Sequence, residues 1–151
     1  MWEAIFSSVN LLAMAGWLIL ILLPRKPLAL SAILYLGVGL LCLVYAAGLL
    51  SIVTGIVDPV GPEGANASFS TIEGVRGIFA SNGGVTVGWT HYLAFDLFVG
   101  LWIAKDADAK QVSRFVQAPI LFATFMAGPV GLFVWLIVRE RRARKLGRMR
   151  A

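Results

Sequence analysis

The stretch HYLAFDLF, residues 91–98, places two ionisable side chains inside an apolar segment. Asp96 lies near the middle of that segment, where an ionised carboxylate costs about 2.5–3.5 kcal/mol in hydrocarbon. It must therefore face the interior of a helix bundle, find a hydrogen-bond donor or stay protonated. An ionisable residue inside a membrane span is by default a candidate for function, and with His91 five positions before it the two are candidates for proton-transfer chemistry.

Both residues also have a purely structural interpretation. Asp96 could hydrogen-bond to a neighbouring helix, and His91 could be a packing residue whose ring nitrogens are satisfied. Five residues at 100° each put the two side chains about 140° apart around a helix, so they do not form an i, i+4 pair. A directly bonded His–Asp pair on this helix is not expected, and joint action requires that the bundle turn both toward one cavity.

The elements that must position these residues are apolar helices. Hydrophobic residues make up 59% of the 151 residues and charged residues 14%. Apolar stretches long enough to cross a membrane as helices cover residues 4–23, 28–57, 85–104 and 116–138. The sequence therefore predicts an all-α integral membrane protein, a bundle of four transmembrane helices in one domain over residues 1–138. Residues 139–151 form a basic tail.

A short amphipathic helix is expected between the second and third spans. Residues 58–84 begin with turn-forming Gly, Pro, Asn and Ser, but TIEGVRGIFAS follows with Ile72, Val75, Ile78 and Phe79 at helical spacing. This pattern favours a helix lying at the membrane interface, with Thr71 as its cap and Glu73 in its first turn.

The orientation of the chain remains open because the positive charges conflict. Lys and Arg number none before the first span, two, one and three in the successive connections, and seven in the tail. With four crossings, the tail favours both termini in the cytoplasm, whereas the first two connections favour the reverse. A re-entrant fourth segment at GPVG would remove the conflict, although irregular backbone at that depth must be buried by protein. Otherwise Pro129 predicts a kink there, and Gly128 and Gly131 permit close packing.

Several other side chains could contact an apolar ligand. Asn10, in the first span, could hydrogen-bond to Asp96 across the bundle or simply join two helices. Trp89 and Trp102 fit the role of interface anchors, whereas Tyr92 and the phenylalanines lie deeper and could line a site for a long apolar molecule. The candidate substrate-binding residues from this reasoning are Asn10, Trp89, Tyr92, Phe95 and Phe125.

Several classes of site are excluded by composition. One histidine and one cysteine, Cys42, cannot supply the usual zinc or iron ligands, so no metal site and no cofactor are predicted. The basic pI does not imply nucleic acid, because seven of thirteen basic residues lie in the tail beside a membrane. That tail is expected to contact anionic lipid, or to be a disordered end. Expected partners are membrane lipids, an apolar isoprenoid ligand such as a carotenoid, and a second copy of the chain in a homo-oligomer.

The motifs MWEAIFSSVNLLAMAGWLILILLPRKP, TIEGVRGIFAS, GWTHYLAFDLFVGLWIAKDA and FATFMAGPVGLFVWLIVR together resemble the neoxanthin-synthase-like family. This abscisic-acid-deficient-four-like group consists of small four-helix membrane proteins, and the resemblance extends to about Arg139. It implies rearrangement of a carotenoid epoxide into an allene and an alcohol without net oxidation. Such a reaction needs a proton donor at the epoxide oxygen and removal of a vinylic proton, so we assign Asp96 as the general acid and His91 as the general base, with water as an alternative base. Arg76 matches a motif position of the family and joins the candidate substrate-binding residues.

Two other functions stay open beside this isomerase. A carotenoid or retinoid cleavage or oxygenation enzyme would use the same apolar site with oxygen. A non-catalytic carotenoid- or lipid-binding protein would hold pigment without turnover. The expected location is a bacterial inner membrane.

Overall fold

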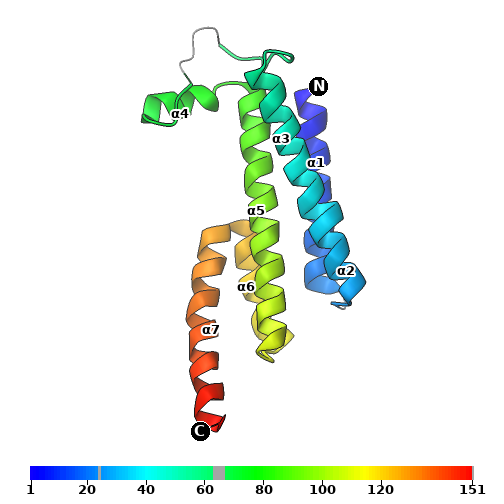
Figure 1. The fold of residues 1–151 in the computed structure, drawn as a ribbon, viewed down its shortest axis with the longest axis vertical. Helices are drawn as coiled ribbons and strands as arrows, with labels where there is room; N and C mark the ends of the chain where they lie inside the picture. The colour runs from blue at the N-terminus through cyan, green and yellow to red at the C-terminus, as the bar shows by residue number, and fades with distance from the viewer. Residues whose placement is uncertain (24, 63–66, 151) are drawn as a thin grey trace.

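The computed structural model describes residues 1–23, 25–62 and 67–150, with side chains described as far as Arg141. These residues are helical apart from the connections, as Figure 1 shows. A long helix, Pro27–Val53, is continuous but contains a π-helical stretch, η1, between α2 and α3. The elements are α1 (Trp2–Leu22), α2 (Pro27–Ala32), η1 (Ile33–Gly39), α3 (Leu40–Val53), α4 (Ile72–Ile78), α5 (Asn82–Ala109), α6 (Arg114–Met126) and α7 (Gly128–Arg150).

Three helices of the described part are long and apolar enough to cross a membrane: α1, the helix Pro27–Val53, and α5. The chain is therefore an all-helical membrane protein, and the apolar helices expected for the first three spans are confirmed. The second ends at Val53, earlier than residue 57, and the third runs from Asn82 to Ala109, beyond both predicted ends. At its N-terminal end α5 begins three residues before the apolar stretch, at Asn82. The Ser81 hydroxyl caps this end by accepting the Gly84 N–H at 3.0 Å.

The four-span bundle is not confirmed, because residues 116–138 do not form one helix. The chain leaves the helical conformation at Ala127 (φ −155°, ψ 81°), and α7 runs back beside α6 (Figure 1). Proline disfavours helix at the residue before it and lacks an N–H, but it fits the first turn of a new helix. Pro129 therefore lies in the first turn of α7, directly after Gly128, and does not kink a continuous span.

Helix α5 lies at the centre of the packing, with α1 and α3 on one side and the α6–α7 hairpin on the other (Figure 1). Small residues of α1 and η1 let α5 approach closely: a Cβ added at Gly16 or Gly37 would lie 2.8 or 3.2 Å from the Leu97 side chain. Conversely, the Trp17 ring fills the space beside Gly100. Leu97 and Trp17 are both buried, so this is the core that fixes α5 against α1.

The predicted amphipathic helix between the second and third spans is confirmed as α4. The Thr71 hydroxyl accepts the Gly74 N–H at 3.0 Å, which caps the helix as expected. Figure 1 shows α4 projecting sideways from the end of α5 that lies near the N-terminus of the chain, while the C-terminus lies at the opposite end.

Candidate functional site

Asp96 lies half-way along α5, opposite the turn between α6 and α7. Gly128, the first residue of α7, packs directly against its carboxyl group: a Cβ at position 128 would lie 1.8 Å from Oδ1. The side chain is half-buried and Gly128 is buried. The carboxyl group thus sits at the start of α7, where the helix dipole presents partial positive charge.

The backbone at the turn leaves few polar groups without partners. The Ala127 carbonyl accepts the N–H groups of Val130 and Gly131 at 2.9 and 3.2 Å, and the Ala127 N–H donates to the Ala123 carbonyl at 2.8 Å. Pro129 has no N–H to satisfy. Asp96 therefore faces a compact helix start, with Gly128 as the residue in contact with it.

His91 lies on another face of α5 and is exposed. Its ring stacks on Phe95 with centroids 4.6 Å apart, and it contacts the rings of Tyr45 on α3 and Tyr92 at 5.4 and 6.2 Å. No described contact joins His91 to Asp96, in agreement with the expectation that the two do not pair directly on one helix.

Aromatic rings form a continuous series across α5 from α1 to α3. Phe6 stacks on Trp89 at 6.2 Å, Trp89 contacts Tyr92 at 6.5 Å, and Tyr92 contacts His91. Trp89, Tyr92 and Phe95 are each exposed by about half, 43%, 56% and 56% respectively. In a membrane protein these side chains face lipid, so the series is accessible to an apolar ligand.

Asn10 joins this aromatic series and does not reach Asp96. Its Oδ1 accepts the Trp89 Nε1–H at 3.0 Å, and its Nδ2 donates to the Phe6 carbonyl at 2.7 Å. Of the two expected roles, the structure supports the one that joins two helices, α1 and α5.

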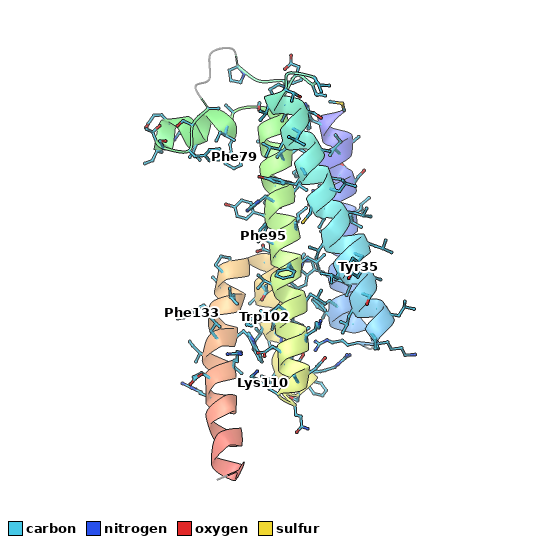
Figure 2. All side chains as sticks on the ribbon, viewed as in Figure 1. Tyr35, Phe79, Phe95, Trp102, Lys110 and Phe133 are labelled. Carbon is cyan, nitrogen blue, oxygen red and sulfur yellow. The ribbon has the colours of Figure 1, made fainter. Side chains whose placement is uncertain are left out.

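Of the remaining candidates, Phe95 lies on α5 next to the site, as Figure 2 shows. Phe125, next to the last residue of α6, packs edge-on against Trp17 with centroids 5.6 Å apart. Arg76 is on α4, its side chain is exposed, and it lies 3.9 Å from Glu73. The structure therefore brings Asn10, Trp89, Tyr92, His91 and Phe95 together, with Asp96 one turn beyond Tyr92, and leaves Arg76 apart.

The sequence reasoning missed a partly buried polar cluster at the other end of α5, made of Arg25, Asp108 and Gln117 and here called the basal cluster. Arg25 is 5% exposed in its side chain and donates to Asp108 at 2.7 Å, to the Ala104 carbonyl at 3.2 Å and to Gln117. Gln117 is fully buried and donates to Asp108 at 3.0 Å. A glutamine inside an apolar stretch was the one available signal.

Two cavities lie away from Asp96. One of about 500 Å³ opens between α1, α3 and α5 and is lined by apolar side chains together with the hydroxyls of Ser8, Ser51, Thr86 and Thr90. The other, about 480 Å³, lies beside α4 and is lined by residues that include Arg76 and Phe79. Within the described residues there is no cluster of His, Cys, Asp and Glu that could hold a metal ion.

Comparison with known proteins places the chain in one family. The model of the family described as ABA DEFICIENT 4-like matches residues 4–135. No curated protein and no solved structure matches the chain. The match extends from α1 into the first turns of α7, including His91, Asp96 and Gly128, and it agrees with the resemblance carried by the sequence motifs. The chain belongs to the ABA DEFICIENT 4-like family.

Proposed function

We propose that this chain is a membrane-embedded isomerase that rearranges an epoxy-carotenoid-like apolar substrate by acid–base chemistry. Family membership relates the chain to the carotenoid and abscisic acid pathways. The observation that carries the proposal is the position of Asp96, a carboxyl at the middle of a membrane-spanning helix, held against Gly128 beside lipid-facing aromatic rings. We also propose a bacterial inner membrane as its location.

Asp96 acts as the acid in this proposal. Its protonated carboxyl donates a proton to the epoxide oxygen, the carbon–oxygen bond breaks, and the oxygen becomes an alcohol. Removal of a proton from the neighbouring vinylic carbon then leaves the electron pair that completes the allene, so the product is an isomer of the substrate. The start of α7 stabilises the carboxylate left behind, because a helix N-terminus favours negative charge.

His91 is the proposed base. It is the only imidazole in the chain, and its ring borders the exposed side chains of Tyr92 and Phe95. A substrate end group that reaches both His91 and Asp96 must lie across these two rings, because the two residues are about 140° apart around α5. Water at the same position is the alternative base.

The remaining proposed contacts hold the substrate. Trp89, Tyr92 and Phe95 supply flat apolar surfaces for a polyene, and Asn10 fixes the Trp89 ring. Phe125 would contact the substrate near the turn between α6 and α7. Arg76, on α4, would contact a polar end of the substrate at the membrane interface.

The test is to produce Asp96→Asn and His91→Ala in a carotenoid-accumulating host and to separate the pigments by chromatography. Loss of a general acid or base lowers the rate by about 10²–10⁴-fold, so the epoxide should accumulate and the allenic product should fall below detection. Asp58→Asn, in the loop after α3, is a matched control that should leave product formation unchanged. Normal product from Asp96→Asn at normal protein abundance would refute the acid role.

A binding protein without turnover is the second candidate, favoured by the cavity of about 500 Å³ between α1, α3 and α5. Its apolar walls and hydroxyl groups suit an apolar molecule with a polar end. Pigment that co-purifies with the protein in detergent and stays chemically unchanged in both the wild type and Asp96→Asn would support this candidate over the isomerase.

A further inference from the structure

The α6–α7 hairpin has the length of half a membrane. At 1.5 Å per residue, α6 measures about 20 Å and the apolar part of α7, residues 128–138, about 16 Å, against a hydrocarbon layer of about 30 Å. Its outer surface is apolar, with Phe122, Met126, Val130 and Phe133 each more than half exposed. Such a hairpin suits lipid on its outside, but neither helix alone reaches across the bilayer.

The tip of the hairpin is protected as a re-entrant segment requires. Irregular backbone is tolerated at membrane depth only where protein covers it. Gly128 and Gly131 are buried, and a Cβ at Gly131 would lie 2.3 Å from the Thr124 backbone nitrogen, so α6 and α7 touch at the turn. Asp96 covers the other side of the turn through its contact with Gly128.

The base of the hairpin is fastened to the end of the bundle that carries the α1–α2 connection. Gln117 on α6 joins Arg25 and Asp108 in the basal cluster, and Arg114 donates to the Leu23 carbonyl at 3.1 Å. Arg139 on α7 donates to Asp106 at 2.7 Å. The start of α6 and the end of the apolar part of α7 therefore lie at the same end of the bundle.

This arrangement removes the conflict between the charges of the chain. If residues 114–139 turn back without crossing, the first connection, the third connection and the tail all lie on one side. Twelve of the thirteen Lys and Arg residues are then on that side, and only Arg76 is on the other. An asymmetry of this size fixes that side as cytoplasmic by the positive-inside rule.

We propose that α6 and α7 form a re-entrant hairpin inserted from the cytoplasmic side, with the N-terminus of the chain outside and the C-terminus inside. The hairpin fills the inner half of the membrane beside α5, and the face of α5 formed by Val85, Trp89, Tyr92 and Asp96 opens to the outer leaflet. These residues share one face because they are spaced by four, three and four. From Asp96 to the start of α5 this face measures about 20 Å.

The position of this face specifies the ligand that reaches Asp96, a step that rests on the proposed function. The ligand is an apolar chain that enters from the outer leaflet, with its reacting group at the middle of the membrane and the rest extending toward α4. A fully extended molecule that spans the membrane has its two ends at the two interfaces. Its reacting end therefore cannot lie at Asp96, which is at the middle of the membrane.

The topology is tested with cysteine reporters in the full chain, on a Cys42→Ala background. Ser70→Cys, Ser113→Cys and Arg141→Cys are treated with a membrane-impermeant maleimide in right-side-out and inverted membrane vesicles. We expect Ser113→Cys and Arg141→Cys to react only in inverted vesicles and Ser70→Cys only in right-side-out vesicles. Reaction of Arg141→Cys on the side of Ser70→Cys means a fourth crossing and overturns the proposal, and so does the reverse orientation of all three.

The depth of the tip is measured with bimane attached at Met126→Cys and quenched by lipids with nitroxides at different acyl positions. We expect the strongest quenching from nitroxides near the acyl terminus, whereas the control Phe115→Cys, at the start of α6, should respond to nitroxides near the headgroup. Equal shallow quenching at both positions would place the hairpin on the membrane surface and overturn the proposal.

Opening to the outer leaflet is tested with a nitroxide lysolipid added from outside to right-side-out vesicles. Bimane at Val85→Cys should be quenched, whereas bimane at Phe133→Cys, on the side of α7 away from α5 (Figure 2), should not. The opposite pattern overturns the leaflet assignment. Asp96→Asn should keep all three patterns, so failure of the topology and failure of the proposed chemistry are distinguishable.

Discussion

The carboxyl group of Asp96 and the Cα of Gly128 are in direct contact, although the residues lie on different helices 32 positions apart. The contact joins the middle of α5 to the first residue of α7. It depends on the absence of a side chain at position 128, because a Cβ there would lie 1.8 Å from Oδ1 and 2.5 Å from the carboxyl carbon of Asp96. The same contact sets the distance between the carboxyl and the positive end of the α7 dipole.

Gly128→Ala should therefore destabilise the protein by about 1–3 kcal/mol, the usual cost of overpacking. The clash is with a side chain, so truncating that side chain should relieve it: Asp96→Ala combined with Gly128→Ala should be more stable than Gly128→Ala alone. Unfolding in detergent measures both. Gly39→Ala is the matched control, since its Cβ would make only an ordinary 3.5 Å contact with the Leu34 carbonyl. A destabilisation that is purely additive in the double variant would contradict the contact.

Gly131→Ala should behave differently, because its new Cβ would meet backbone. It would lie 2.3 Å from the nitrogen and 2.5 Å from the Cα of Thr124, as well as 2.1 Å from Oγ1. Removing the hydroxyl with Thr124→Ala cannot relieve a backbone clash, so the double variant should remain as unstable as Gly131→Ala. Disulfide trapping between neighbouring positions of α6 and α7 would measure whether the hairpin has opened. Full rescue by Thr124→Ala would show that the helices are less closely packed.

The basal cluster should contribute strongly to stability. Arg25→Met removes hydrogen bonds to Asp108, Gln117 and the Ala104 carbonyl and leaves the fully buried Gln117 with an acceptor unsatisfied, which costs about 1–3 kcal/mol. Arg25→Lys should restore only part of this, since an ammonium group cannot replace the planar guanidinium. The readout is the detergent unfolding midpoint.

Arg76→Met is the matched control for the basal cluster, because Arg76 forms an exposed 3.9 Å pair with Glu73. Surface substitutions of this kind change stability by about 0.5 kcal/mol or less. Equal effects of Arg25→Met and Arg76→Met would mean that the cluster does not hold the base of the hairpin.

Local patterns in the sequence predict much of this fold. Apolar length alone identified α1, the helix Pro27–Val53 and α5, and the spacing around Thr71 identified α4 and its cap. The sequence allows the reversal at Ala127 only as one of two alternatives, because GPVG is compatible with a kink and with a turn. What decides between them is contact with α5, above all the fit of Gly128 against Asp96, and such contacts between distant residues are not visible in local composition.

The same reason explains what was missed in the polar contacts. Arg25 and Gln117 are 92 positions apart, and in sequence one belongs to a charged connection and the other to an apolar stretch. Asn10 was expected to have a partner on another helix, and it has one, but the relative register of α1 and α5 selects Trp89 and not Asp96. Register depends on the packing of Gly16 against Leu97 and of Trp17 against Gly100, which the sequence pattern does not specify.

The Asn10–Trp89 hydrogen bond predicts a separable effect on ligand binding. Trp89→Phe keeps the ring that stacks on Phe6 but removes the Nε1–H donated to Asn10 at 3.0 Å. Interhelical hydrogen bonds in membranes contribute about 0.6 kcal/mol on average, so stability should change little. If the Trp89 ring lines the path to Asp96, its loss of orientation should weaken substrate binding and leave the maximal rate nearly unchanged.

Titrating the substrate in reconstituted vesicles separates these quantities, with Asn10→Leu expected to reproduce the effect of Trp89→Phe and the double variant to add nothing. Trp102→Phe is the matched control, because the Trp102 ring contacts Arg139, 5.9 Å from its centroid, at the opposite end of α5. Its substrate dependence should equal that of the wild type. A change in maximal rate alone for Trp89→Phe would place Trp89 in the reacting centre, whereas equal effects at both tryptophans would assign them only to anchoring at the membrane interface.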